Sequence, residues 1–232
     1  MTGLAVFDWN STLIDDIDAC VEAKNAALAF LGHPPITRRR LQEIFTFPIL
    51  HAYVQAGVDP DHYLAHAEEV GDIYVSTYKQ AAESCTLRRH TIDVLEWLQA
   101  RDIPAIILSN HLQSHLTPHV ESMGIAHYFE TISGTKDYAT ILHKMNKQER
   151  LENYLNENAY QPEKSFIIGD SHEEPELARH LGLTGISITG GLLTPGRIAA
   201  CAPDHVIDDM HELLPVMERL FNDDAPLAKG GL

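Results

Sequence analysis

The sequence predicts an α/β fold, a parallel β-sheet with an inserted all-helical domain, and two observations support this. Short apolar runs alternate with helical patterns at the start of the chain and again from about residue 88, as in a parallel sheet with right-handed crossovers. Residues 15–87 show helical patterns and no strand signal. We therefore expect an α/β core of residues 1–14 and 88–232 and a helical cap of residues 15–87.

The first predicted strand covers residues 4–7, a short apolar run with β-branched and aromatic members. It ends on Asp8. In open α/β sheets, ligands bind just beyond the carboxyl ends of the strands. Asp8 is thus a candidate site residue, and the alternative is that it caps a helix or opens a turn.

Three helical stretches are expected in the insertion. The first ends at Gly32 after an acidic start, the second is capped by Thr37, and the third opens at Asp59 and runs through Tyr78. The segment 46–48, Thr-Phe-Pro, interrupts the pattern. We expect it to be a loop that contacts the substrate, with packing of Phe47 in the cap core as the alternative.

The second half of the chain alternates between strands and helices. We expect strands at 105–108, 129–134, 165–169, 185–189 and 205–208, and helices at 92–98, 112–123, around 151–155, 176–181 and 210–221. The tail from residue 222 is expected to be loose.

Polar residues follow three of these strands. They are Asp8, the pair Ser109–Asn110, and Asp170 after Gly169. Because parallel strands bring their carboxyl ends to one edge of the sheet, these side chains should lie together. This convergence favours a site role for Asp8 over a structural one.

Composition narrows the possible partners and the compartment. The net charge of −16 argues against nucleic acid or an anionic membrane as the main partner. The three cysteines are far apart and form no disulfide or paired metal motif, which fits a reducing compartment. We see no leader pattern and no membrane-spanning apolar run, and we expect a cytoplasmic protein.

Four short motifs, taken together, resemble those of the haloacid dehalogenase superfamily. They are Phe7-Asp8-Trp9-Asn10-Ser11-Thr12, Leu108-Ser109-Asn110, a downstream lysine, and Ile168-Gly169-Asp170-Ser171-His172-Glu173-Glu174. Their order and spacing match that family across its whole Rossmann-like core. The helical insertion after the first motif looks like the small cap of the phosphoglycolate phosphatase-like branch.

The resemblance implies a role for each motif residue. Asp8 would be the nucleophile that forms an aspartyl-phosphate, and Ser109, Asn110 and Thr12 would bind phosphate. Mg²⁺, which prefers oxygen ligands, would be bound by Asp8, Asp170, Glu174 and the backbone carbonyl of Asn10.

The phosphate-binding lysine has three candidates before the fourth motif, Lys136, Lys144 and Lys147. The number of residues between Lys147 and Asp170 fits the spacing of the family's motifs best, and Lys144 is the alternative. For either, a solvated surface lysine remains the other interpretation.

Asn10 departs from the pattern of the family's phosphatases, which usually have a second aspartate there for proton transfer. An amide cannot exchange a proton in this way, and loss of such help typically costs about 10²–10⁴ in rate. The sequence thus predicts a Mg²⁺-dependent phosphatase of a small phosphorylated metabolite. The alternative is a phosphate-binding or regulatory protein with weak turnover, and a less favoured one is a dehalogenase or phosphonatase. The oligomeric state is left open.

The chain also carries fourteen histidines. His111, His115 and His119 recur every four residues and would share a face of a continuous helix, as zinc ligands can. Pro118 argues against a regular helix there. His111 follows the second motif and could face the pocket, or lie near it by chance.

Overall fold

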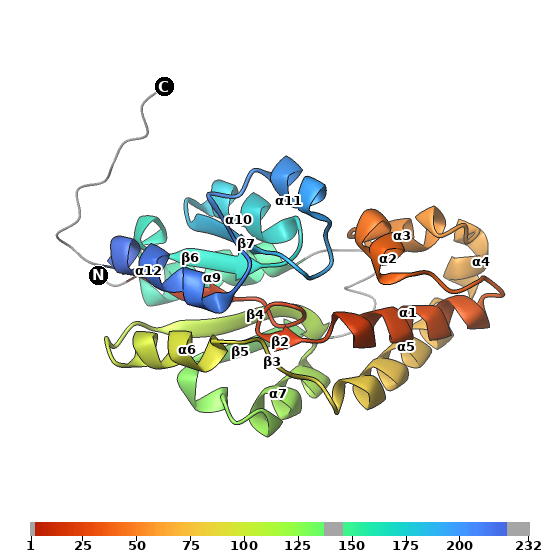
Figure 1. Ribbon diagram of the computed structural model, residues 1–232, viewed down its shortest axis with the longest axis horizontal. Helices are drawn as coiled ribbons and strands as arrows, with labels where there is room; N and C mark the ends of the chain where they lie inside the picture. The colour runs from red at the N-terminus through yellow and green to blue at the C-terminus, as the bar shows by residue number, and fades with distance from the viewer. Residues whose placement is uncertain (1–2, 137–145, 222–232) are drawn as a thin grey trace.

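The computed structural model describes residues 3–136 and 146–221. Its centre is a six-stranded parallel sheet (Figure 1). The order of its strands is β5-β4-β1-β6-β7-β8. The strands are β1 (Ala5–Phe7), β4 (Ala105–Leu112), β5 (Thr131–Thr135), β6 (Phe166–Gly169), β7 (Thr184–Ile188) and β8 (His205–Ile207). The predicted parallel sheet is therefore confirmed.

Strand β1 lies in the middle of the sheet, between β4 and β6. Phe7 is paired with Ile107 on one side and with Ile168 on the other. The residues that follow these positions, Asp8 and the segments 108–110 and 169–170, therefore reach the same edge of the sheet.

Helices cover both faces of the sheet. On one side, Ala5 and Phe7 of β1 pack with apolar residues of α6, α7 and α12; on the other, Leu4 and Val6 pack with those of α9 and α10. This alternation follows from the two-residue period of a strand. The helices are α6 (Thr91–Gln99), α7 (Gln113–Ser122), α9 (Lys147–Asn158), α10 (Glu173–Leu181), α11 (Pro195–Cys201) and α12 (Leu214–Phe221). Single 3₁₀ turns are η1 (Ala126–Tyr128), η2 (Pro162–Lys164) and η3 (Met210–Leu213).

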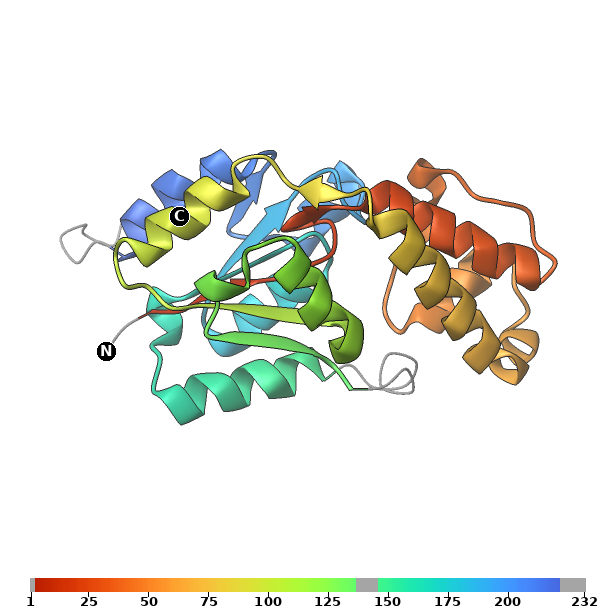
Figure 2. The same ribbon diagram turned by 90° about the horizontal axis from the view of Figure 1, so that it is seen from below.

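Between β1 and β4, residues 17–82 form an all-helical insertion at one end of the molecule (Figures 1 and 2). Its long helices α1 and α5 pack side by side, and its own apolar residues form further clusters. Its helices are α1 (Ile17–Phe30), α2 (Arg38–Ile44), α3 (Ile49–Gln55), α4 (Pro60–Ala65) and α5 (Ala67–Ala82).

Several element boundaries differ from those that the sequence predicts. The expectation of no strand within 15–87 is wrong at its margins, because β2 (Ile14–Asp15) and β3 (Thr86–Leu87) pair antiparallel where the chain enters and leaves the insertion. The third helical stretch is broken at His66, between α4 and α5. Helix α11 is not among the predicted helices; Ile198 is its one buried residue, so no apolar period marks it in the sequence.

Two further differences affect the site. Helix α10 begins at Glu173, three residues before the predicted start, so both glutamates of the fourth motif lie in its first turn. Strand β4 continues to Leu112 with an irregular pairing to β5. Gly134 permits this, because a side chain there would collide with the carbonyl of His111.

Among the described residues, no helix is both long enough and apolar enough to cross a membrane.

Candidate active site

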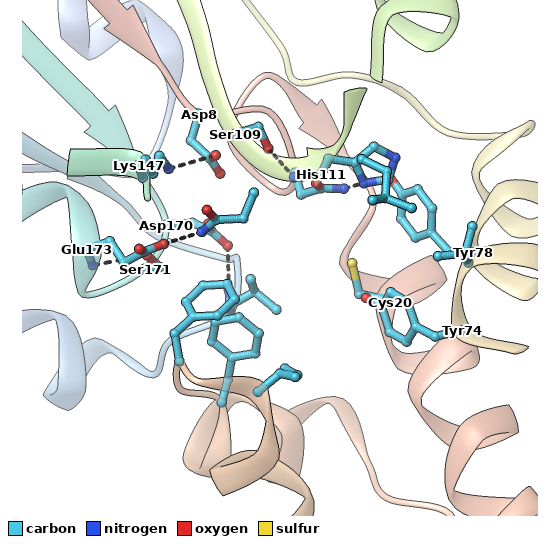
Figure 3. Close-up of a pocket in the computed structure, with 18 of the residues that line it drawn as sticks. Asp8, Cys20, Tyr74, Tyr78, Ser109, His111, Lys147, Asp170, Ser171 and Glu173 are labelled. Carbon is cyan, nitrogen blue, oxygen red and sulfur yellow. Dashed lines mark hydrogen bonds and ion pairs between the residues drawn. The ribbon is translucent and has the colours of Figure 1, made fainter. Parts of the chain in front are cut away.

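A cavity lies between the carboxyl ends of β1, β4 and β6 and the helical insertion (Figure 3). The sheet side supplies polar residues and the insertion supplies mainly apolar ones. The sheet-side lining includes Asp8, Asn10, Ser109, Asn110, His111, Lys147, Asp170, Ser171, Glu173 and Glu174. The predicted convergence of three strand ends is present.

Lys147 joins two carboxylates at the base of the cavity. Its Nζ lies 3.0 Å from Oδ1 of Asp8 and 2.5 Å from Oε1 of Glu174. Its side chain is only 2% exposed. Lys147 is the first residue of α9, so the start of that helix positions the ammonium group. Lys136 is exposed, and Lys144 lies outside the described residues.

This cluster shifts the pKa values of its members. Burial raises the pKa of Asp8 to about 6, although Lys147 opposes the shift. Burial would also raise the pKa of Glu174, but the charge of Lys147 and hydrogen bonds from Lys147 and Ser171 hold it below its usual value. For Lys147, burial disfavours the charge, but Asp8 and Glu174 outweigh burial and raise its pKa.

One carboxylate oxygen of Asp170 accepts a hydrogen bond, and the other has no hydrogen-bond partner among the described residues. Its Oδ2 accepts a hydrogen bond of 2.7 Å from the backbone N–H of Leu192. Its Oδ1 is buried and has no hydrogen-bond partner among the described residues. Burial, and then the charges of Asp8 and Glu174, raise the pKa of Asp170 well above its usual value. A cation beside Oδ1 would relieve both costs.

The residues present fit a magnesium ion that is bound by two carboxylates. In the part of the chain that is described, no group of three or more His, Cys, Asp or Glu side chains is placed to hold a metal. Mg²⁺ often takes only one or two carboxylates and completes its shell with water and substrate phosphate. Asp8 and Asp170 can supply the two carboxylates. Glu174 is occupied by Lys147 and Ser171, so its role as a metal ligand stays a prediction.

Asn10 takes part in a closed hydrogen-bond network. Its Nδ2 donates to Oδ2 of Asp16 and to the hydroxyl of Tyr78, each at 2.7 Å. The Tyr78 hydroxyl donates to the same Asp16 oxygen at 2.5 Å. Tyr78 belongs to α5, so the network connects the loop after β1 with the insertion.

Asp16 also holds that loop in shape. Ser11 has a φ of 51°, an uncommon value for a residue other than glycine. Its N–H and its hydroxyl both donate to Oδ1 of Asp16, at 2.6 and 2.8 Å. Burial raises the pKa of Asp16. The sequence gives no sign of this role, because Asp16 lies in an acidic run that looks like an ordinary helix start.

Two of the three predicted phosphate-binding residues line the cavity, and the third does not. Ser109 and Asn110 line the cavity, whereas Thr12 is buried outside its lining and its Oγ1 has no hydrogen-bond partner among the residues described. The side chain of Asn110 donates to Glu173 at 2.5 Å. Asn110 lies within β4 and not at a helix start, since α7 begins only at Gln113.

The histidine trio does not form a metal site. His111 is in β4, whereas His115 and His119 are in α7, so the three do not share a helix. They are not placed to hold a metal, as noted above. His111 lines the cavity beside Tyr78, with ring centroids 5.2 Å apart (Figure 3). Burial lowers the pKa of His111 to about 3, so its ring is neutral at neutral pH.

The helical insertion supplies the opposite wall of the cavity. Phe47 follows α2 in the predicted contact loop and does line the cavity. The lining side chains from the insertion are Cys20, Phe45, Phe47, Ile49, Tyr53, Tyr74, Val75 and Tyr78. Tertiary contacts of this kind leave no local signal in the sequence, and only the break at 46–48 pointed to them.

Comparison with known proteins gives relatives along most of the chain. A phosphoglycolate phosphatase of Pseudomonas putida is 25% identical over 216 residues, covering 91% of this chain and 78% of that protein. A phosphoglycolate phosphatase of Synechococcus elongatus is 22% identical, covering 93% and 97%.

Solved structures show the same fold. A haloacid dehalogenase-like hydrolase from Streptococcus pneumoniae superimposes with a TM-score of 0.77 at 24% identity, covering 93% of this chain and 98% of that one. A predicted phosphoglycolate phosphatase from Haemophilus somnus gives a TM-score of 0.71 at 18% identity, with coverage of 93% and 97%. The family model for haloacid dehalogenase-like hydrolases matches residues 5–188, and the chain belongs to that family.

Proposed function

We propose that this protein is a Mg²⁺-dependent phosphatase of a small phosphorylated metabolite, with Asp8 as nucleophile. The observation that carries the proposal is the contact of Asp8 with the buried Lys147, beside an Asp170 oxygen that has no hydrogen-bond partner among residues 3–136 and 146–221. This arrangement supplies a carboxylate and a fixed cation and leaves a place for a second cation. Phosphoryl transfer depends on such positioning and charge neutralisation.

In the proposed reaction, an oxygen of Asp8 attacks the phosphorus atom and the bond to the leaving oxygen breaks. Lys147, Ser109 and the N–H of Asn110 face the phosphoryl oxygens. Water then attacks the aspartyl-phosphate and releases phosphate and the Asp8 carboxylate. Bound to Asp8, Asp170 and the Asn10 carbonyl, Mg²⁺ would neutralise charge on the phosphoryl group.

We further propose that residues 15–87 act as a cap that excludes water from this reaction. Its helix α2 already contacts the loop after β7. Arg38 donates to the carbonyl of Gly190 at 2.6 Å, and Gln42 donates to that of Gly191 at 2.7 Å. The carbonyl of Gln42 in turn accepts a 2.8 Å bond from Arg197.

The test is phosphate release from acetyl phosphate in the presence of Mg²⁺. Acetyl phosphate is small and has a good leaving group, so it needs neither a matching pocket nor an acid at position 10. We expect wild-type turnover, none with Asp8→Asn, and none when the metal is chelated. Turnover that survives Asp8→Asn would rule out the nucleophile assignment.

The network around Asn10 supports a second candidate, a phosphate-binding or regulatory protein with weak turnover. The Asn10 amide cannot move protons, and both of its N–H groups are already donated. Calorimetric binding of inorganic phosphate and Mg²⁺ by a protein that hydrolyses no phosphomonoester would support it. Halide release, or phosphate release from a phosphonate, would instead indicate the less favoured dehalogenase or phosphonatase.

A further inference from the structure

The wall of the cavity that faces the sheet edge is aromatic. Phe45 and Phe47 meet edge to face with ring centroids 5.1 Å apart. Tyr74 and Tyr78 are nearly parallel, with an interplanar angle of 5° and centroids 6.4 Å apart, and Figure 3 shows them across the cavity from Asp8 and Lys147. Leu192, from the loop after β7, is a further apolar residue that lines the cavity. Such a wall favours a flat, apolar group.

The charges in the cavity disfavour a substrate that carries a carboxylate in addition to its phosphate. Among the described lining residues, Lys147 is the one lysine or arginine, and Asp8 and Glu174 already bind its Nζ. Lys24 of α1 is buried with its Nζ 3.2 Å from the centroid of the Tyr53 ring, but it does not line the cavity. A carboxylate on the substrate would meet the carboxylates of the site without a cation on the aromatic side to bind it.

Asn10 adds an independent constraint on the leaving group. Its amide donates both hydrogens to Asp16 and Tyr78, so it supplies no proton to a departing oxygen. An alkyl alcohol is about as weak an acid as water, whose pKa is about 15.7, and leaves slowly unless it is protonated. A phenol ionises near pH 10, as tyrosine does, and can leave as the phenolate.

From these observations we infer that the substrates are phosphate monoesters of phenols that carry no other charged group. The inference rests on the proposed phosphatase function. The ring lies against Phe47 and Tyr74, and the phosphoryl group faces Asp8. As the bond from phosphorus to Asp8 forms, the bond to the phenolic oxygen breaks, and the electron pair leaves with that oxygen. The phenolate then takes a proton from water.

Four substrates separate these features when kcat/KM is measured for each. Phenyl phosphate has the ring and the good leaving group, benzyl phosphate has the ring alone, acetyl phosphate has a good leaving group alone, and phosphoglycolate has neither. We expect phenyl phosphate to exceed benzyl phosphate by about 10²-fold, because residue 10 supplies no proton. It should exceed phosphoglycolate by a larger factor.

Variants test the aromatic wall. Phe47 is half-buried, and Phe47→Ala should lower kcat/KM for phenyl phosphate by about 10-fold and lower that for acetyl phosphate by a smaller factor, because acetyl phosphate has no ring to lose a contact. Phe47→Arg should raise kcat/KM for phosphoglycolate, since it adds the missing cation. The matched control is Phe30→Ala, an aromatic residue of the insertion that is 46% exposed and outside the cavity lining.

The outcomes distinguish this inference from the proposed function. If acetyl phosphate is hydrolysed through Asp8 but phosphoglycolate matches or exceeds phenyl phosphate, the aromatic substrate class is overturned and the phosphatase stands. Equal rates for phenyl and benzyl phosphate overturn the leaving-group requirement. If acetyl phosphate is not hydrolysed through Asp8, both the function and the inference fail.

Discussion

The amide nitrogen of Asn10 lies 2.7 Å from a carboxylate oxygen of Asp16, six residues further along the chain. Phosphatases of the haloacid dehalogenase family usually have an aspartate at the position of residue 10. Here the acid is at position 16 and the amide at position 10, and Tyr78 bonds to both. An aspartate at position 10 would place two carboxylates at hydrogen-bond distance.

The first prediction concerns this pair. Asn10→Asp should lower the free energy of unfolding by about 1–3 kcal/mol, because two donated hydrogen bonds are replaced by the repulsion of two acids. The double exchange Asn10→Asp with Asp16→Asn should restore most of this stability, since the amide and the acid only trade places. Urea denaturation measures both. Asp18→Asn, in the same acidic run but with a side chain 87% exposed, is the control.

Enzyme kinetics provide a second test of the contact between Asn10 and Asp16. The double exchange puts a proton-transferring group next to the nucleophile, so turnover of alkyl phosphates such as benzyl phosphate should rise, by up to about 10²–10⁴-fold. If Asn10→Asp alone is as stable as the wild type and as active as the double exchange, the contact with Asp16 does not require an amide at position 10.

The second prediction concerns Lys147. Lys147→Met removes the cation between Asp8 and Glu174 and leaves buried carboxylates unpaired, which typically costs about 3–5 kcal/mol. Phosphatase turnover should fall by at least about 10²-fold. Denaturation and acetyl phosphate hydrolysis measure the two effects. Lys136→Met, at an exposed position, should change neither, and an unchanged Lys147→Met would exclude Lys147 from the site.

The sheet edge of the site could be predicted from the sequence, and the insertion side could not. Asp8, Ser109 and Asp170 each follow an apolar run of the sequence, and the parallel pairing of those runs brings the three residues together. The bond from Tyr78 to Asp16 spans 62 residues and depends on how α5 packs on α1. Glu173 was missed as a first-turn residue because the helical pattern of α10 becomes apolar only later.

The third prediction is the pH dependence of stability without metal. Burial raises the pKa of Asp8 to about 6 and that of Glu173 to about 8, both above their unfolded values. Between the unfolded and the folded pKa, the folded protein binds more protons than the unfolded one, so its stability falls as pH rises. The metal-free protein should therefore unfold at lower urea concentration at pH 8 than at pH 5.

Magnesium should reverse this trend. It binds ionised carboxylates, so it should stabilise the protein more at pH 8 than at pH 5. The variant Asp170→Asn removes the negative charge of the carboxylate whose Oδ1 has no partner in the described part of the chain, and it should abolish most of the effect. Equal stabilisation of wild type and Asp170→Asn by Mg²⁺ would place the metal elsewhere.

The last prediction concerns Gly191, which lies against Asp170. A Cβ atom at this position would collide with Oδ2 of Asp170, the oxygen that accepts the hydrogen bond from Leu192. Gly191→Ala should therefore displace either the loop or the carboxylate, lower stability by about 1–3 kcal/mol and weaken Mg²⁺ binding by about 10-fold or more. Gly196→Ala is the matched control, because its Cβ would meet nothing within 4 Å and lies in helix α11. Alanine favours a helix over glycine by about 1 kcal/mol, so this control should be at least as stable as the wild type and bind Mg²⁺ normally. If both variants bind Mg²⁺ like the wild type, the loop at Gly191 does not position Asp170 for the metal.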